Sequence, residues 1–161
     1  YMNNFIFNFF NFIIDFVFTS VDFEYISSYS IRYFILYCNA DINYNNPQVY
    51  DRWLNGINRT YVRLYVPKGS KLISSKGSEV AVTTIEDLDK TVFEAFIQVR
   101  PANSRQLIFE YELPQPFSGK EYDLLIQKQP GTKDFQYEIK VNGDTKEKFE
   151  LNKDKQLKIN I

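Results

Sequence analysis

The stretch that decides the fold is TVFEAFIQVRPANSRQLIFEYEL, residues 91–113. Apolar side chains recur at every second position in its first half, and the same spacing resumes after the segment Pro101-Ala102-Asn103-Ser104. A period of two with one apolar face indicates a half-buried β-strand, and a Pro/Asn/Ser cluster between two such runs indicates a turn. The sequence therefore predicts two successive strands with these inward-facing residues: Phe93, Ala95, Ile97, Val99, Leu107, Phe109, Tyr111 and Leu113.

The same pattern continues outward from this stretch in both directions. Residues 59–66 (RTYVRLYV) alternate in the same way, and further short runs follow at 122–128, 135–141 and 157–161, with Asn142-Gly143 as a two-residue hairpin signal. About seven to nine short strands at roughly ten-residue spacing are typical of a sandwich. We therefore expect an all-β chain, folded as an antiparallel β-sandwich of immunoglobulin-like size with Greek-key topology; an open barrel is the structural alternative.

Composition divides the chain into two unequal parts. All thirteen lysines lie at or after Lys68, whereas nine of the fifteen phenylalanines lie in the first 40 residues. We therefore expect an aromatic and Asn-rich leader of uncertain structure at residues 1–41 and a β-sandwich domain at residues 42–161.

The leader has three competing interpretations. Its first 18 residues fit an amphipathic helix for a membrane surface or a partner, although they contain no Lys or Arg; they also fit a helix or strand buried in the domain. A third hypothesis is translation in a wrong reading frame of A/T-rich DNA. Because Tyr1 stands in place of an initiator Met, we expect a fragment or a processed product. The polar residues on the helical stripe are Asn4, Asn8, Asn11 and Asp15.

Charge and reactive residues exclude several function classes. With 19 basic and 20 acidic residues the formal charge is −1, so no net field favours a nucleic acid, an acidic polymer or an anionic membrane as a partner. The chain has no histidine and one cysteine, Cys38, which excludes His-based triads, His metal sites, an intramolecular disulfide and a multi-cysteine zinc site. We therefore expect no enzyme activity, no catalytic residues and no cofactor.

Acidic residues gather in one predicted hairpin loop, at Glu86, Asp87 and Asp89. Hard cations such as Ca²⁺ take oxygen ligands from loops of this kind, so these carboxylates are weak candidates for a metal site. A solvated hairpin tip is the more typical role, because the spacing is not that of an EF-hand.

The segment YDRWLNG, residues 50–56, holds the only tryptophan, Trp53. Together with Tyr50 and Arg52 it is a candidate ligand-binding aromatic that would contact sugar or protein from an exposed loop. A lone tryptophan more often plugs one end of a sandwich, so that interpretation stands beside the first.

Three blocks carry a resemblance to a known family: YVRLYVPKGSKLI (residues 61–73), PANSRQLIFEYELP (residues 101–114) and YDLLIQKQPGT (residues 122–132). In this order they resemble the C-terminal part of the bacterial proteins grouped as domain of unknown function (DUF) 4012. The resemblance covers residues 42–161. It implies envelope proteins with a transmembrane anchor near their N-terminus, here outside this chain, and a β-rich region on the outer side of the membrane. It implies no known activity.

Two functions are consistent with these observations. The first is a non-catalytic, extracytoplasmic module of a membrane-anchored bacterial cell-envelope protein, acting as a spacer or as an interaction and assembly surface for envelope proteins. The alternative is a carbohydrate-binding accessory module of an envelope-polymer-processing protein. Either way, the expected membrane association runs only through the anchor outside this chain.

Overall fold

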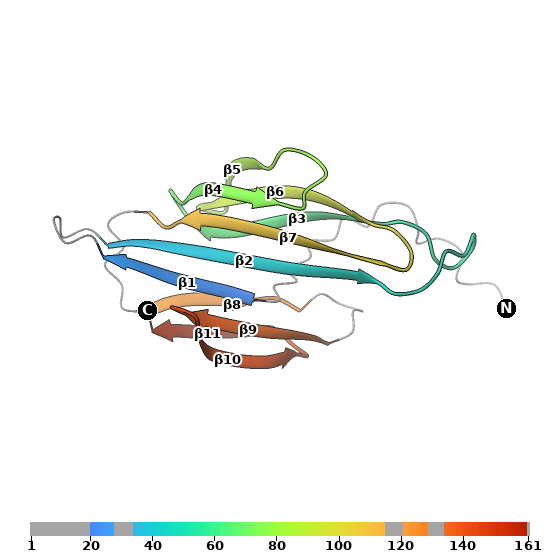
Figure 1. The fold of residues 1–161 in the computed structure, drawn as a ribbon. Coiled ribbons are helices and arrows are strands. Elements are labelled where there is room, and N and C mark those ends of the chain that lie inside the picture. Colours follow the sequence, from blue (N-terminus) through green and yellow to red (C-terminus); the bar gives the residue numbers. More distant parts are fainter. Residues whose placement is uncertain (1–19, 28–33, 115–120, 129–133, 161) are drawn as a thin grey trace.

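The computed structural model describes residues 20–27, 34–114, 121–128 and 134–160, and every helix-or-strand element within them is a β-strand. The expectation of an all-β chain is therefore confirmed. In chain order the strands, drawn in Figure 1, are β1 (Ser20–Ser27), β2 (Phe34–Asn46), β3 (Asn58–Pro67), β4 (Lys71–Lys76), β5 (Thr83–Asp87), β6 (Lys90–Val99), β7 (Asn103–Glu112), β8 (Glu121–Ile126), β9 (Phe135–Val141), β10 (Asp144–Leu151) and β11 (Lys155–Asn160).

The strands form three sheets. The largest has the order β10-β9-β1-β2-β7-β4, the second has the order β3-β6-β5, and β11 pairs with β8 in the third. The pairs are antiparallel as expected, with one exception in the described chain: β1 runs parallel to β9, with Val21 opposite Ile139. A parallel pair joins segments far apart in sequence, which strand periodicity does not encode.

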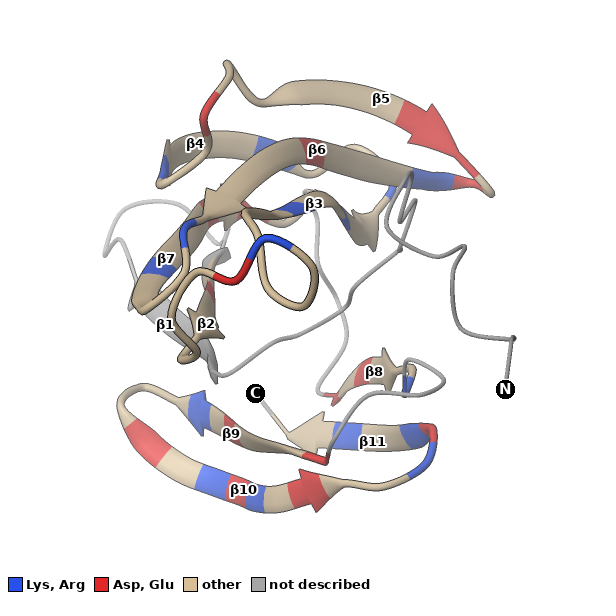
Figure 2. Cartoon of the chain, turned by 90° about the vertical axis from the view of Figure 1, so that its right-hand side faces the viewer, with Lys and Arg blue, Asp and Glu red and all other residues tan. Residues whose placement is uncertain are grey.

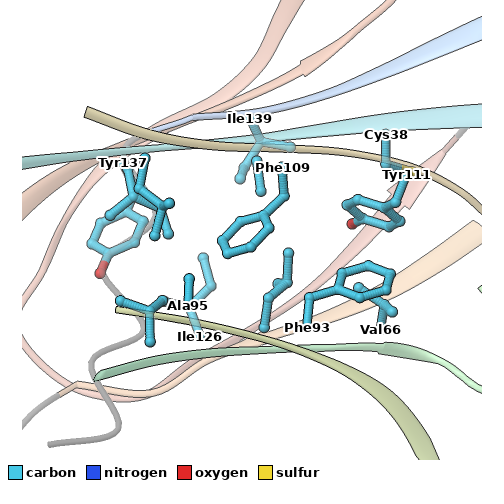
Figure 3. Packing of buried hydrophobic residues seen from close by; sticks show 14 of the residues in the cluster. Cys38, Val66, Phe93, Ala95, Phe109, Tyr111, Ile126, Tyr137 and Ile139 are labelled. Carbon is cyan, nitrogen blue, oxygen red and sulfur yellow. The ribbon is translucent and has the colours of Figure 1, made fainter. Parts of the chain in front are cut away.

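The buried core forms where the alternation predicted it. On β6 and β7 every residue predicted to face inward is buried, and Phe93 and Phe109 are fully so. Their rings stack with centroids 6.4 Å apart. Figure 3 shows both residues within the buried cluster. Burying a phenylalanine side chain contributes about 2–3 kcal/mol of transfer free energy. The same cluster includes Ile126 of β8 and Ile139 of β9, so all three sheets share one core.

Two tight hairpins close neighbouring strands. Asn142 and Gly143 join β9 to β10 with φ angles of 54° and 81°, which confirms the predicted two-residue turn. Leu88 and Asp89 join β5 to β6 with φ angles of 50° and 57°. Two successive positive φ angles give the turn the twist of its flanking strands.

The expected boundary near Asp41 falls inside a strand. Strand β2 runs through it, and Asp41 lies opposite Ser20 of β1 on one side and Ile108 of β7 on the other. Strands β1 and β2 occupy the middle of the six-stranded sheet, so the described part of the leader shares a sheet with the β domain. The amphipathic stretch of residues 1–18 lies outside the described residues.

Candidate functional site

Residues 47–57 connect β2 to β3, and the loop of residues 48–57 projects beyond the strand ends at the right-hand side of Figure 1. Its local sequence explains its shape. The carboxylate Oδ1 of Asp51 accepts hydrogen bonds from the backbone N–H of Trp53 (2.8 Å) and of Leu54 (2.9 Å). Asp51 and Asn55 also exchange two backbone hydrogen bonds, of 2.9 and 3.1 Å. An aspartate that caps the following N–H groups stabilises a tight turn, so the tip has a defined conformation.

Further bonds fix this loop to the body of the domain. The buried amide Nδ2 of Asn46 donates to the carbonyl of Gly56 (3.0 Å) and to that of Val99 (3.3 Å). The backbone N–H of Ala102, in the turn between β6 and β7, donates to the carbonyl of Gln48 at 2.7 Å. The Gln48 end of loop 48–57 is therefore attached to the β6–β7 turn, and the Gly56 end is attached to Asn46, which also bonds to the last residue of β6.

The three predicted ligand-binding residues all lie on this loop, and all are exposed. Trp53 keeps 71% of its surface accessible and Tyr50 keeps 69%, so the interpretation of Trp53 as a plug of the domain is wrong. The guanidinium carbon of Arg52 lies 5.4 Å from the centre of the Trp53 ring, a cation–π distance. The hydrogen bonds to Asp51 engage the backbone N–H groups of Trp53 and Leu54 within the turn.

Sequence reasoning missed the aliphatic side chains beside them. Val49 is 74% exposed, Leu54 is 82% exposed and Ile57 is 42% exposed. The available signal was their position: they lie between Pro47 and the start of β3, in a segment with no period-two alternation. Apolar residues outside a periodic segment have no sheet face to enter.

Two of the candidate metal-binding carboxylates pair with a lysine. Lys68 Nζ lies 3.5 Å from Glu86 and 3.2 Å from Asp89. The hydrogen bond to Asp89, together with both negative charges, raises the pKa of Lys68. The positive charge therefore occupies the place that a cation would take between these two side chains.

The third carboxylate faces a different surface. Asp87 accepts a hydrogen bond from the Tyr65 hydroxyl at 2.9 Å and lies 3.4 Å from Arg63. Arg63 Nε in turn lies 2.9 Å from Glu94 on the neighbouring strand. Hydrogen bonds from Tyr61 and Arg63 lower the pKa of Glu94. The acidic residues are thus divided between two ion-pair groups, and the described part of the chain contains no cluster of three potential metal ligands.

The lone cysteine is enclosed in the core. Cys38 lies beside Tyr111, which Figure 3 shows, and only 2% of Cys38 is exposed. Burial raises the pKa of the Cys38 thiol to about 12, although a hydrogen bond with Tyr111 acts in the opposite direction. Because the thiolate is the nucleophile, this side chain is inert at neutral pH.

No protein-family model matches this chain, and searches of curated proteins and of solved structures found no significant match. Within the described ranges no helix is long and apolar enough to cross a bilayer.

Proposed function

We propose that this chain is a non-catalytic, extracytoplasmic module of a larger bacterial cell-envelope protein, and that loop 48–57 is its contact surface. The observation that carries the proposal is the exposure of Tyr50, Trp53 and Leu54 on a loop with a defined backbone. Large apolar side chains gathered on a surface are typical of interaction sites.

The reactive groups described above support a binding role. Cys38 is buried and protonated, and the carboxylates of Asp87 and Glu94 are engaged by Arg63. The chain has no histidine to act as a general base near neutral pH. These side chains stabilise the sheets. We therefore expect a partner to bind the exposed loop.

The architecture that we propose for this module is a β-sandwich. Its support is the shared core: Phe93 of the three-stranded sheet meets Phe109 and Tyr111 of the six-stranded sheet, with ring centroids 6.4 and 5.7 Å apart. Side chains from two sheets that interdigitate in this way are characteristic of sheets packed face to face.

The location in the envelope rests on the resemblance of residues 61–73, 101–114 and 122–132 to the DUF 4012 family. Fractionation of the source bacterium, followed by detection with an antibody against this chain, tests it. We expect the full-length protein in the membrane and wall fraction, accessible to protease added to intact cells. Recovery in the cytosolic fraction would contradict the location.

The contact surface is tested by photo-crosslinking. A benzophenone amino acid placed at Tyr50 is expected to form crosslinks to an envelope component when the chain is incubated with isolated envelopes. The matched control is the same amino acid at Leu125, which is 56% exposed on β8. Crosslinks from position 125 with none from position 50 would show that the contact surface lies elsewhere.

A second candidate function is glycan binding, and the exposed aromatic pair Tyr50 and Trp53 favours it. Exposed aromatic rings offer a flat apolar face with a polar edge. A screen against envelope glycans, with Trp53→Ala as the variant and Leu125→Ala as the control, separates the candidates. Binding that only the Trp53 variant loses supports a carbohydrate-binding module, whereas an absence of binding by the parent chain contradicts it.

A further inference from the structure

Loop 48–57 concentrates exposed apolar surface. In the described part of the chain ten large hydrophobic side chains are exposed, and five of them lie on this loop. Leu54 and Val49, at 82% and 74% exposure, are aliphatic and have no polar atom of their own on the side chain. Single exposed apolar residues are common, whereas several large ones on one protruding loop are typical of an interaction site.

The same end of the molecule carries an excess of positive charge. Arg52 lies on the loop, Arg100 lies in the adjoining β6–β7 turn, and Arg59 and Arg105 lie at the near ends of β3 and β7. All four are exposed, and none forms an ion pair with an acidic residue among those described. Figure 2 looks onto this end, where the loop faces the viewer.

Acidic residues are scarce there. Residues 43–60 and 97–107 contain four arginines and one acidic residue, Asp51, which leaves an excess of three positive charges on a chain whose net charge is −1. Asp51 is moreover occupied by the backbone N–H groups of the turn. A local field of this sign attracts an anionic partner.

The loop also requires little ordering before it binds. The side-chain amide of Asn55 donates to the carbonyls of Gln48 (2.8 Å) and Val49 (3.1 Å), and Asn46 ties the far end of the loop to β6. A loop that already has its bound conformation loses less conformational entropy on association.

We propose that this end of the molecule, defined by the apolar tip Val49, Tyr50, Trp53, Leu54 and by the flanking arginines, binds the surface of an anionic lipid bilayer. The aliphatic side chains enter the acyl boundary, the aromatic rings lie at the level of the headgroups, and the arginines meet lipid phosphates. A sugar or a polyanion would use the aromatic rings and the arginines, but not the protruding Leu54 and Val49. The inference rests on the proposed function, since it names the partner of the same contact surface. It differs from the expectation that membrane association runs only through an anchor outside this chain, because it adds a direct contact made by loop 48–57.

The single tryptophan provides the readout. The full 161-residue chain is titrated with vesicles of phosphatidylcholine alone and with vesicles that also contain phosphatidylglycerol, and the emission of Trp53 is recorded together with co-sedimentation. We expect a blue shift and sedimentation with the anionic vesicles only, both weakened by added salt. Unchanged emission with anionic vesicles would overturn the proposal.

Variants separate the apolar and the charged contributions. Leu54→Asp on the tip, and Arg52→Gln combined with Arg100→Gln, are each expected to weaken vesicle binding by about tenfold or more. Leu125→Asp, at an exposed position on β8, is the control and is expected to bind as the parent does. Equal losses in the Leu54 and Leu125 variants would overturn the assignment to loop 48–57.

The failure of this inference is distinguishable from failure of the proposed function. A response of Trp53 to a soluble anionic polysaccharide, with none to vesicles, would overturn the membrane proposal and leave the contact surface in place. Suppose that Trp53 emission does not change with vesicles and that photo-crosslinks form from position 125 but not from position 50. These results together would overturn both the membrane proposal and the proposed contact surface.

Discussion

The side chain of Asn46, the last residue of β2, donates a hydrogen bond of 3.0 Å to the backbone carbonyl of Gly56, ten residues further along the chain. This bond closes loop 48–57 at its base. The same amide nitrogen reaches the carbonyl of Val99, so one buried side chain joins the loop to the domain.

Replacing Asn46 by Ala leaves two carbonyls without this donor, and we expect a loss of about 1–2 kcal/mol in the free energy of unfolding. Urea unfolding followed by circular dichroism measures it, and hydrogen exchange of loop amides should rise at the same time. The matched control is Asn45→Ala, because Asn45 is exposed and adjacent. Equal stability of the two variants would contradict the role given to Asn46.

Gly77 follows β4 with a φ of +92°, and a Cβ placed on it would lie 1.9 Å from the carbonyl oxygen of Gln106 on β7. Gly77→Ala combines this backbone clash with an unfavourable φ, so we expect a destabilisation of about 2–4 kcal/mol. Gly56→Ala is the control, since a Cβ there meets nothing within 4 Å. The prediction fails if thermal unfolding of the two variants occurs at the same temperature.

Phe109 has no accessible surface and stacks on Phe93 of the three-stranded sheet. Phe109→Ala removes the ring and opens a cavity in the buried core, which is expected to cost about 3–5 kcal/mol. Leu54→Ala, at the exposed tip, should change stability by less than about 0.5 kcal/mol. A comparable loss at both positions in denaturant unfolding would mean that the core has been placed wrongly.

Ionisation of the Cys38 thiol is expected to lower the free energy of unfolding at alkaline pH. Its pKa is raised from 9.0 to about 12 in the folded chain, so the unfolded chain releases this proton first. The stabilisation is fully present below pH 9 and is lost as pH rises from 9 towards 12, by about 1 kcal/mol between pH 8 and pH 10. Comparing the parent with Cys38→Ala in urea measures the contribution that depends on this thiol. If the free energy of unfolding of the two chains changed with pH in the same way, this contribution of Cys38 would be excluded.

The local structure of the β-domain could be read from the sequence because its strands bury one face. Leu107, Phe109 and Tyr111 recur with period two, and only an extended chain turns them all to one side. Asn142-Gly143 likewise defines its turn, because few other pairs accept two positive φ angles.

What the sequence could not supply was long-range pairing. Val21 lies opposite Ile139 in the parallel pair, although nothing in either strand specifies its partner. The leader looked separate because its composition differs, but backbone pairing depends on hydrogen-bonding groups that every residue except proline carries. Composition therefore placed a boundary at Asp41, in the middle of β2.

The sequence identified the residues of the candidate site but did not predict their exposure. Tyr50, Arg52 and Trp53 were identified by residue type, yet the frequency with which tryptophan is buried favoured a plug. The exposure of Trp53 depends on Asp51, whose carboxylate turns the backbone at this point. The bond from Ala102 to Gln48 joins the loop to the turn that contains Arg100, and nothing in the local sequence predicts it.

The central claim is that Trp53 lies on an exposed and positively charged surface. Quenching of Trp53 fluorescence by iodide and by caesium ions, measured at equal ionic strength, tests both parts of the claim, because the two quenchers carry opposite charge. We expect iodide to quench strongly and caesium weakly. The difference should shrink when Arg52 and Arg100 are both changed to Gln, and it should persist when Lys158 on β11 is changed to Gln. Resistance to both ions, or equal quenching by both in the parent chain, would contradict the account.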